Sequence, residues 1–395
     1  MIKNLEKNVK TIEEYLEYKK TQTIDIVDLV NYFAYKNGVK IKFNDKMSRI
    51  DNIVNPKKNI VFILVDGMGA YKVANLDDKS ILKQNIKAAI QTVNPTSTAC
   101  VLTTVATGKY PSEHGILGWW NYSKENNISY YPLLFLENKT GKSLEEKGYK
   151  MKNFFKYNSL FEKYNKDVNI YMKRTIIESN YSKYFSGKKA KRHGVYSIKD
   201  GFDKIIKNIN EQSKASFNYF YISGLDDVSH KYGMDSYEAL GIIKEVEEGI
   251  QKIARICNDT TIVVTADHGQ INMSKHLYLN QNNDYTKYFY AAPSIDTRII
   301  SFFVKEECKN EFEEMFSNEF FEDIVLLTKD EFLKYGFIGD EYSKYALNSI
   351  GEYVGIVVTD NFLIADTVNL EDYMATKGNH SGITKEETTI PLIVI

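Results

Sequence analysis

The sequence is poor in cysteine, proline and tryptophan, and it contains no long apolar run. Among 395 residues there are three cysteines, six prolines and two tryptophans. The cysteines, Cys100, Cys257 and Cys308, form an odd and sparse set, which excludes a small fold held together by disulfides. No stretch approaches the roughly 20 consecutive apolar residues that a membrane-spanning helix needs, so no membrane contact is expected.

An excess of charge of one sign is also missing. Lys and Arg together number 51 and Asp and Glu together number 52, so no overall positive field attracts DNA, RNA or an anionic membrane. A small phosphorylated ligand is compatible with this balance, whereas a polymeric nucleic acid is not expected as a partner. Residues 1–20 carry charges throughout and lack the apolar segment of a secretory signal. A cytoplasmic location is therefore expected, unless a longer precursor was trimmed.

Four apolar runs rich in β-branched residues are present instead. Runs of this kind are typical of strands that are buried on both faces of a parallel sheet. Helix-like stretches lie between them, notably at 98–107 and 236–256, and alternation of strands and helices predicts a mostly parallel sheet covered on both sides. The predicted fold class is α/β, a three-layer α/β/α sandwich. The four predicted strands are Asn59–Val65, Asn218–Ser223, Thr260–Thr265 and Ile390–Ile395.

A helical extension precedes this alternation, and two regions within it fit the pattern poorly. Residues 1–55 show helical spacing of apolar positions and predict one or two amphipathic helices that precede a catalytic domain at 56–395. The ranges 120–215 and 275–375 have weak or mixed periodicity and are expected to be insertions, or a cap over the sheet. An amphipathic arm such as 1–55 often packs against a partner subunit, so association into a homo-oligomer is one expectation for it.

Acidic and imidazole side chains follow the predicted strands. In open α/β sheets the ligand site lies beyond the carboxyl ends of the strands, so side chains at three such ends are expected to meet. Asp and His ligands without Cys suit Zn²⁺, with Mn²⁺ or Fe as alternatives. Two such ions about 3.5–4 Å apart form the usual clamp for displacement at phosphorus. The candidates are Asp66, Asp226 with His230, Asp267 with His268, and His380 before the last strand.

Thr98 is the candidate nucleophile. It lies in Asn94-Pro95-Thr96-Ser97-Thr98, at the start of a predicted helix. A hydroxyl is a poor nucleophile at its free pKa, and metal coordination activates it. A helix N-terminus adds backbone N–H donors for a phosphoryl oxygen. Taken alone, Thr98 could instead be a helix N-cap, as could Thr96 or Ser97.

The order and spacing of these motifs resemble those of the alkaline phosphatase superfamily, in its type I phosphodiesterase/nucleotide pyrophosphatase family. The nucleophile segment is similar from Pro95 to Pro111 without a gap. The other family motifs appear in the expected order along the chain. They are a strand before Asp66-Gly67, the Asp226-x-x-x-His230 pair, Asp267-His268-Gly269, and His380. The resemblance covers roughly 56–120, 216–275 and 325–395. It implies the superfamily fold and a covalent phospho-threonine intermediate.

The resemblance also implies two metal sites. One would comprise Asp226, His230 and His380. The other would comprise Asp66, Asp267, His268 and the hydroxyl oxygen of Thr98. The chain departs from the family pattern directly after the nucleophile. The family commonly has Phe-Pro-Asn there, and this chain has Ala99-Cys100-Val101. A side-chain donor to the phosphoryl group is missing there, which weakens any inference of nucleotide preference.

Several neighbouring residues have structural interpretations. His114, in a Pro-x-x-His-Gly turn, is expected to be structural, and His193 belongs to a basic stretch that predicts a solvated loop. The four-residue spacing to His230 selects Asp226 over Asp227 as the ligand. The segment Trp119-Trp120-Asn121-Tyr122 could be an aromatic wall for a nucleobase or could pack an insertion. Cys100 lacks the Cys-x-Pro-x-Arg context of sulfatases.

The leading functional hypothesis is hydrolysis of a phosphodiester or pyrophosphate bond in a small substrate. A phosphomonoesterase or phosphomutase could use the same two-metal site, but such enzymes usually add charged groups for the extra phosphate charge, and none is evident beside Thr98. A third hypothesis, of another class, is a catalytically silent nucleotide-binding regulatory protein. The presence of every proposed ligand and of the nucleophile argues against it.

Overall fold

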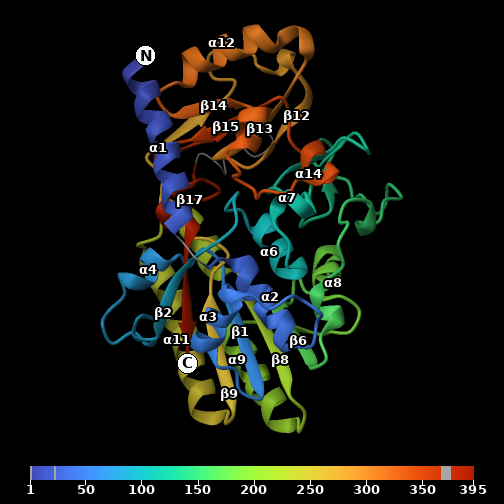
Figure 1. Ribbon diagram of the computed structural model, residues 1–395, viewed down its shortest axis with the longest axis vertical. Coiled ribbons are helices and arrows are strands. Elements are labelled where there is room, and N and C mark those ends of the chain that lie inside the picture. Colours follow the sequence, from blue (N-terminus) through green and yellow to red (C-terminus); the bar gives the residue numbers. More distant parts are fainter. Residues whose placement is uncertain (1, 22–23, 366–374) are drawn as a thin grey trace.

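A seven-stranded sheet forms the centre of the larger half of the molecule (Figure 1). The computed structural model describes residues 2–21, 24–365 and 375–395. The strand order is β2-β18-β9-β1-β8-β6-β7, and in this sheet only β18 runs antiparallel to its neighbours. The mostly parallel sheet that the sequence predicts is therefore confirmed. Its strands span Asn59–Val65 (β1), Ile86–Gln91 (β2), Asp167–Lys173 (β6), Lys191–Val195 (β7), Ser216–Ile222 (β8), Thr260–Thr265 (β9) and Thr389–Val394 (β18).

Helices precede and connect the strands of this sheet along the chain. They include α1 (Ile2–Thr21), α2 (Ile26–Lys36), α3 (Asp45–Val54), α4 (Ala70–Ala74), α5 (Ile81–Gln84), α6 (Thr98–Thr107), α7 (Pro111–His114), α8 (Asn180–Ser186), α9 (Ile198–Glu211), α10 (Gly224–Tyr232), α11 (Tyr237–Ile256) and α16 (Lys385–Thr388). The predicted helix at 98–107 matches α6, and the one predicted at 236–256 matches α11.

The side chains of β1 and β8 alternate between two helical layers, because successive side chains of a strand point to opposite faces. Phe62 and Phe217 pack on one face against Phe33 of α2, with ring centroids 4.9 and 5.5 Å from it. Phe220 points to the opposite face and meets Phe202 of α9 at 5.3 Å. All seven residues of β1 and of β8 are buried. The sheet is thus the middle layer of an α/β/α sandwich.

A second, antiparallel sheet forms the smaller half, which we call the cap (residues 275–364). Its order is β12-β13-β15-β14, and α12 covers one face, where Phe312 and Phe316 pack on Phe302 at 5.4 and 5.0 Å (Figure 1). Part of the range expected to be an insertion, 366–374, lies outside the described residues. The cap elements are β11 (Lys275–Tyr278), β12 (Phe289–Ile295), β13 (Ile299–Val304), α12 (Lys309–Phe320), β14 (Ile324–Thr328), α13 (Lys329–Lys334), α14 (Lys344–Asn348), β15 (Tyr353–Val357) and β16 (Asn361–Ile364).

The N-terminal region contains three helices rather than the one or two expected. Helix α1 runs along the side of the molecule from the cap to the sheet domain (Figure 1). Its Tyr15 stacks on Phe337 of the cap at 5.7 Å, and its Tyr18 hydroxyl lies 2.6 Å from Oγ1 of Thr389 in β18. Helices α2 and α3 contribute buried residues to the core of the sheet domain. The three helices thus pack against the rest of the same chain.

The range 120–215 contains both a peripheral part and two strands of the central sheet. Short strands β3 (Asn121–Ser123), β4 (Ile128–Tyr131) and β5 (Leu136–Glu137) form a separate small sheet. Strands β6 and β7, by contrast, extend the central sheet. Strand β6 contains polar residues, so a hydrophobicity pattern does not mark it as a strand. Asn169 of β6 is fully buried, and its side chain donates a hydrogen bond to Asn218 Oδ1 at 3.2 Å, which offsets the cost of burying a polar group.

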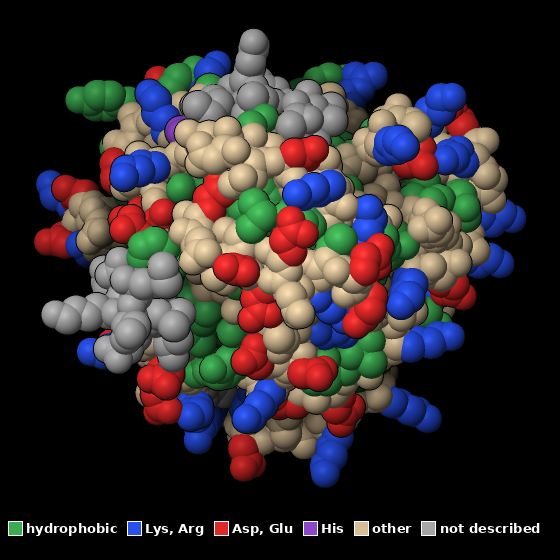
Figure 2. All heavy atoms as spheres, turned by 90° about the horizontal axis from the view of Figure 1, so that it is seen from above, with side chains coloured by type: hydrophobic (Ala, Val, Ile, Leu, Met, Phe, Trp, Pro, Cys, Tyr) green, Lys and Arg blue, Asp and Glu red, His purple; other side chains and the backbone are tan. Residues whose placement is uncertain are grey.

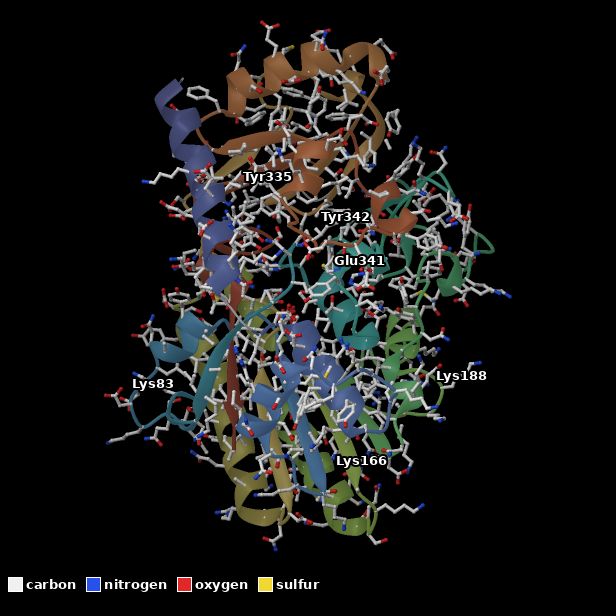
Figure 3. The ribbon with its side chains drawn as sticks, viewed as in Figure 1. Lys83, Lys166, Lys188, Tyr335, Glu341 and Tyr342 are labelled. Carbon is white, nitrogen blue, oxygen red and sulfur yellow. The ribbon has the colours of Figure 1, made fainter. Side chains whose placement is uncertain are left out.

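The surface carries charges of both signs. On the face in Figure 2, lysine and arginine side chains are interspersed with aspartate and glutamate, and no field of one sign covers it. Figure 3 shows Lys83 and Lys188 on opposite sides of the sheet domain and Lys166 in its lower part, with Glu341 and Tyr342 near the junction with the cap. No helix in the described ranges combines the length and the apolar character that crossing a membrane requires.

Candidate active site

Side chains from the carboxyl ends of three neighbouring strands meet beneath the cap. Strand β1 pairs with β8 and β9 on either side. Asp66 directly follows β1, Asp226 lies in the first turn of α10 after β8, and Asp267 and His268 follow β9. His380 approaches from the loop before α16. The structure therefore brings together the side chains that the strand pattern predicts to converge.

One group of side chains surrounds the Thr98 hydroxyl. Nε2 of His268 lies 3.2 Å from Thr98 Oγ1, 3.5 Å from Asp66 Oδ1 and 3.3 Å from Asp267 Oδ2. Asp66, Asp267 and His268 offer ligand atoms close enough together to hold one ion, and all three are buried. This is the set of residues that the resemblance assigns to one metal site.

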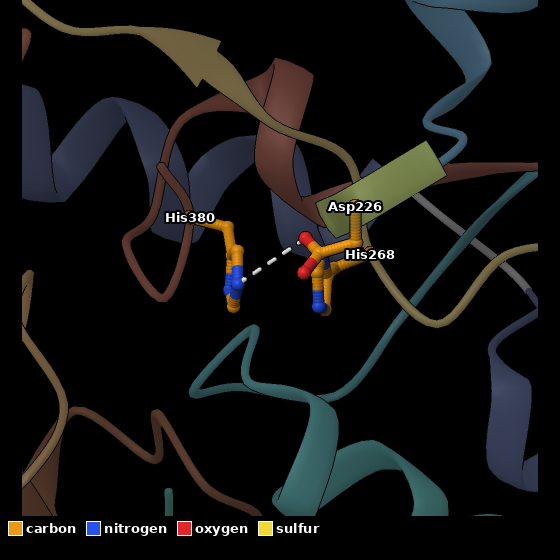
Figure 4. A group of neighbouring side chains, drawn as sticks. All are labelled: Asp226, His268 and His380. Carbon is orange, nitrogen blue, oxygen red and sulfur yellow. Dashed lines mark ion pairs between the residues drawn. The ribbon is translucent and has the colours of Figure 1, made fainter. Parts of the chain in front are cut away.

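A second group surrounds Asp226. Nε2 of His230 lies 3.3 Å from Asp226 Oδ2. Nε2 of His380 lies 3.6 Å from Asp226 Oδ1 (Figure 4). The rings of His268 and His380 stack with centroids 3.8 Å apart, so His268 can also reach an ion held by Asp226 and His380. The two groups are contiguous and share His268.

The three imidazoles are oriented in the same way. Nδ1 of His230 lies 2.7 Å from the carbonyl oxygen of Gly378, Nδ1 of His380 lies 2.7 Å from that of Thr96, and Nδ1 of His268 lies 3.1 Å from that of Gly269. A carbonyl oxygen only accepts, so each Nδ1 donates to it, and Nε2 is the ring nitrogen directed at the carboxylates. This backbone support is the usual arrangement behind metal-ligating histidines.

The buried carboxylates need a counter-charge. Burial, with the charges of Asp267 and Asp226, raises the pKa of Asp66 well above its usual value. Burial also raises the pKa of Asp226, but the imidazoles of His230, His380 and His268 outweigh it and hold that pKa below its usual value. Burial lowers the pKa of His230, yet Asp226 raises it to a net value of about 9.

Two carboxylate oxygens in this site accept nothing from the described residues. These are Asp66 Oδ1 and Asp267 Oδ2, which face His268 Nε2 and are buried. An unsatisfied buried carboxylate oxygen is costly, and a divalent cation satisfies it directly. The donor set, carboxylates and imidazole without thiolates, suits zinc and related ions. The residues present therefore fit the binding of divalent metal.

Thr98 occupies the first turn of a buried helix. Ser97 is the N-cap of α6, and Thr98 is its first residue, so Thr98 is not the cap. The Ser97 hydroxyl makes no hydrogen bond to the helix and instead donates to Asp296 Oδ2 at 2.6 Å. The positive end of α6 is thus left uncapped by a side chain, next to the Thr98 hydroxyl.

Glycines let two loops of the site approach each other. A Cβ at Gly269 would lie 1.9 Å from the carbonyl oxygen of Glu386 and 3.0 Å from Cα of Gly69. A side chain at either glycine would push apart the loops that carry Asp66 and His268. This close approach explains the glycines in the Asp66-Gly-Met-Gly69 and Asp267-His-Gly269 motifs.

Three polar residues of the site were missed in the sequence. Tyr221 donates its hydroxyl to Asp66 Oδ2, and Gln270 donates its amide to Asp226 Oδ1. Asp296, from the cap, receives the hydroxyl of Ser97. Gln270 directly follows Asp267-His268-Gly269, and Tyr221 lies near the end of its strand, so position alone could have marked both. Nothing in the sequence connects Asp296 with Ser97.

Other candidates lie outside the ligand groups. His114 is buried between Thr104 Oγ1 and the backbone N–H of Ile116, both 3.1 Å away. His193 lies in β7, stacked on Tyr171, rather than in a loop. Asp227 is half-exposed at the rim of the site and pairs with Lys173 at 2.6 Å. Ala99, Cys100 and Val101 are fully buried and offer no side-chain oxygen or amide donor.

A cavity of about 380 Å³ opens above Thr98. Trp119 and Trp120 line it, together with Asp226, Asp227 and Asp296, among others. Asn121 instead lies in the interior, where its side-chain oxygen accepts from the backbone of Leu117 and Gly118. Part of the aromatic segment therefore lines the site, and part of it holds a turn.

Comparison with solved structures shows the same fold. Murine ectonucleotide pyrophosphatase/phosphodiesterase 5 superposes with a TM-score of 0.63 at 16% identity, over 85% of this chain and 87% of that chain. The human protein of the same name gives 0.64 at 16% identity over the same shares. Phosphonoacetate hydrolase from Sinorhizobium meliloti 1021 gives 0.58 at 17% identity, over 86% of this chain and 90% of that chain.

Comparison of the sequence gives the family. None of the curated proteins matches the chain significantly in sequence. The family model for type I phosphodiesterase/nucleotide pyrophosphatase matches residues 60–311, which is more than half of the chain and includes Asp66, Thr98, Asp226, His230, Asp267 and His268. The chain thus belongs to the type I phosphodiesterase/nucleotide pyrophosphatase family of the alkaline phosphatase superfamily, and it is a hydrolase of that type.

Proposed function

We propose that this protein is a metal-dependent hydrolase that cleaves a phosphodiester or pyrophosphate bond of a small substrate through a phospho-threonine intermediate. The observation that carries the proposal is the position of Thr98 Oγ1 at the start of α6, 3.2 Å from Nε2 of His268, the residue that the two acidic groups share. The family supports the reaction type. Among the structural relatives, the murine protein was solved with AMP and the phosphonoacetate hydrolase with phosphonoformate.

The side chains divide into two ligand sets. Asp226, His230 and His380 would hold one divalent ion, and His268 also lies within reach of it. Asp66, Asp267 and His268 would hold the other beside Thr98. Ions bound there, with zinc favoured by the donor set and manganese or iron as alternatives, would lower the pKa of the attacking hydroxyl and neutralise charge on the leaving oxygen.

Thr98 supplies the covalent step. Its Oγ1 forms a bond to phosphorus while the bond from phosphorus to the leaving oxygen breaks, and the first product departs as an alcohol or phosphate. Water then attacks the same phosphorus, the Thr98 oxygen–phosphorus bond breaks, and the hydroxyl is restored. Each displacement inverts the configuration at phosphorus. The uncapped N-terminus of α6 offers backbone N–H groups to the phosphoryl oxygens, in place of the asparagine common in the family.

The charge of the cavity favours a diester over a monoester. Its described lining includes three carboxylates, Asp226, Asp227 and Asp296, and no lysine or arginine. A phosphomonoester or a carboxylated phosphonate brings an additional negative charge, and the described lining has no lysine or arginine to receive it. A diester carries a single charge, which the ions alone can balance. The same reasoning disfavours a phosphomutase.

Turnover of two chromogenic substrates tests the proposal. The zinc-loaded enzyme is expected to hydrolyse bis-p-nitrophenyl phosphate with at least about tenfold higher kcat/KM than p-nitrophenyl phosphate, and chelation should abolish both activities. Thr98→Ala should lose about 1000-fold or more, as expected for a nucleophile. Thr103→Ala is a matched control, because Thr103 lies on the same helix and bonds Ala99 and Tyr181 instead of the site.

Three results would contradict the proposal. Preference for the monoester would favour a phosphomonoesterase. Turnover in the presence of excess chelator would show that the reaction does not require metal. Binding of AMP by a metal-loaded wild type without any turnover would favour a regulatory role.

A further inference from the structure

The segment that leads to the nucleophile is buried and is held by hydrogen bonds from several sides. Nδ1 of His380 lies 2.7 Å from the carbonyl oxygen of Thr96, and the Ser97 hydroxyl donates to Asp296 of the cap at 2.6 Å. Thr96 and Ser97 are both buried. A further hydrogen bond, earlier in the segment, comes from helix α1, which precedes the sheet domain in the chain.

This further hydrogen bond joins Asn94 to Tyr15 of α1. Nδ2 of Asn94 donates to the hydroxyl oxygen of Tyr15 at 3.0 Å, and both side chains are buried. Oδ1 of Asn94 accepts nothing from the described residues, so the Tyr15 hydroxyl is the one described hydrogen-bond partner of this side chain. Loss of that hydroxyl would leave a buried amide unsatisfied.

The ring of Tyr15 is fixed by the cap. It stacks on Phe337 with ring centroids 5.7 Å apart and an angle of 4° between the ring planes. One turn later in α1, Nζ of Lys19 donates to the carbonyl oxygen of Gly336 at 2.8 Å. Burial raises the pKa of Tyr15 to about 12, so its hydroxyl is neutral at physiological pH. The cap thus holds a neutral hydroxyl at a defined place beside Asn94.

A second tyrosine of α1 provides a comparison. The Tyr18 hydroxyl lies 2.6 Å from Oγ1 of Thr389, the first residue of β18. This contact joins the same helix to a strand of the central sheet and not to the residues before Thr98. The hydroxyl of Tyr15 is therefore the one that connects α1 with the nucleophile segment.

The contact joins a part of the chain outside the family match to a part inside it. The family model begins to match at residue 60, so it includes Asn94 and excludes α1. The helix runs from the cap to the sheet domain (Figure 1). It therefore touches the segment that carries the nucleophile, besides bridging the two halves of the molecule.

Attack by Thr98 depends on where its oxygen lies. Reacting atoms must be about 3–3.5 Å apart and aligned, and a misplacement of about 1 Å can cost about 100-fold in rate. Thr98 is the first residue of α6, so the path of the chain just before it sets the direction of its side chain. The backbone N–H of Ser97 donates to the carbonyl oxygen of Pro95 at 2.8 Å. A shift at Asn94 would reach Thr98 through this short turn.

We propose that Tyr15 is a positioning residue for the reaction at Thr98. Its hydroxyl holds Asn94, and Asn94 holds the turn that directs Thr98 Oγ1 toward the phosphorus. This inference rests on the proposed function. Tyr15 does not line the cavity above Thr98, so it acts on the position of the nucleophile and not on binding of the substrate.

Single-turnover kinetics of the zinc-loaded, full-length protein test this role. With enzyme in excess over bis-p-nitrophenyl phosphate, release of p-nitrophenolate reports the first displacement. Tyr15→Phe keeps the ring and its stacking but removes the hydroxyl, so the maximal rate should fall by about tenfold. The enzyme concentration at half-maximal rate, which reports substrate binding, should change by less than about twofold.

Two further readouts accompany this measurement. The pH profile of the rate in Tyr15→Phe should keep the midpoints of wild type, because the Tyr15 hydroxyl exchanges no proton in the reaction. Tyr18→Phe is the matched control. It removes a hydroxyl from the same helix and breaks a contact with the sheet, and it should keep the wild-type rate.

Asn94→Leu separates positioning from stability. This change removes the amide and should also slow the first displacement by about tenfold. Adding Tyr15→Phe should slow it no further, because both changes remove the same hydrogen bond. The double variant leaves no unpaired polar group at this contact, so its stability in urea should recover relative to the single variants. Its rate should stay low, whereas a rate that only followed stability would recover as well.

The outcomes separate this inference from the proposed function. If wild type hydrolyses the diester and Tyr15→Phe reacts as fast as Tyr18→Phe, the positioning role is wrong and the reaction type stands. The same conclusion follows if the effects of Tyr15→Phe and Asn94→Leu multiply. If zinc-loaded wild type does not hydrolyse the diester, the proposed function fails, and this inference fails with it.

Discussion

Arg298 and Glu387 form a fully buried, two-pronged ion pair that joins the cap to the loop carrying His380. Nε of Arg298 lies 2.8 Å from Glu387 Oε1, and Nη2 lies 3.2 Å from Oε2, with both side chains inaccessible to solvent. Glu387 also accepts the backbone N–H of Gly382 at 2.8 Å, two residues after His380. The pair therefore connects the position of a candidate metal ligand to the cap.

Breaking this pair from one side should be strongly destabilising. Glu387→Gln leaves the Arg298 charge buried without compensation, which costs about 3–5 kcal/mol. The double variant Arg298→Met with Glu387→Gln removes both charges and retains an acceptor for Gly382, so it should recover much of that loss. Urea denaturation of wild type, Arg298→Met, Glu387→Gln and the double variant measures the coupling free energy between the two side chains. A loss below about 1 kcal/mol in the single variant would contradict a buried, uncompensated charge.

His114 should make the protein less stable as the pH falls. Burial lowers the pKa of His114 from 6.5 to about 3. Its Nδ1 accepts the backbone N–H of Ile116, which only the neutral ring can do. The unfolded chain binds the proton near pH 6.5, so stability is complete above that pH and decreases below it. Between pH 7.5 and pH 5.5 the expected loss from this residue is about 1.4 kcal/mol.

His114→Gln isolates this effect. Urea denaturation of metal-free wild type and His114→Gln at both pH values should show a decrease that is smaller in the variant by about that amount. The other histidines are present in both proteins and cancel in the difference. Equal decreases in the two proteins would show that His114 does not titrate as proposed.

Removing the carboxylate of Asp66 should have opposite effects on thermal stability with and without metal. Burial and the neighbouring carboxylates raise the pKa of Asp66, so ionised Asp66 destabilises the metal-free fold at neutral pH. Asp66→Asn should raise the thermal midpoint in chelator and lower it in zinc. Asp227→Asn, at the exposed rim of the same site, should show no such reversal. A variant that melts below wild type in both conditions would contradict the charge argument.

Tyr221 should support metal binding through Asp66. Its hydroxyl donates to Asp66 Oδ2, and loss of such a supporting hydrogen bond typically costs 10- to 100-fold in metal affinity. Tyr221→Phe should therefore weaken zinc binding by about that factor in a competition titration. Tyr219→Phe is the control, because Tyr219 lies on the same strand and its buried hydroxyl has no described partner. Similar zinc affinities in the two variants would show that Tyr221 does not support metal binding through Asp66.

The elements with strong local patterns could be predicted from the sequence. Strands β1 and β9 begin and end at the predicted residues, because continuous apolar runs mark strands buried on both faces. The meeting of Asp66, Asp226 and Asp267 also followed from sequence, since parallel neighbouring strands end at one edge.

Features that depend on tertiary pairing could not be predicted. Strand β6 contains Asn169, whose burial is acceptable only because Asn218 lies beside it in the folded sheet. Arg298 and Glu387 are far apart in the chain, and either alone has the pattern of a surface charge. Asp296 reaches the nucleophile segment only through the packing of the cap on the sheet domain.

The most direct test of Thr98 as nucleophile is capture of the covalent intermediate. Zinc-loaded enzyme is mixed with bis-p-nitrophenyl phosphate, quenched in acid during turnover, digested and analysed by mass spectrometry. A nitrophenylphosphoryl or phosphoryl group on Thr98 in wild type, absent in Thr98→Ala and present in Thr103→Ala, is the predicted result. Full turnover in Thr98→Ala, or an adduct on another residue, would contradict it.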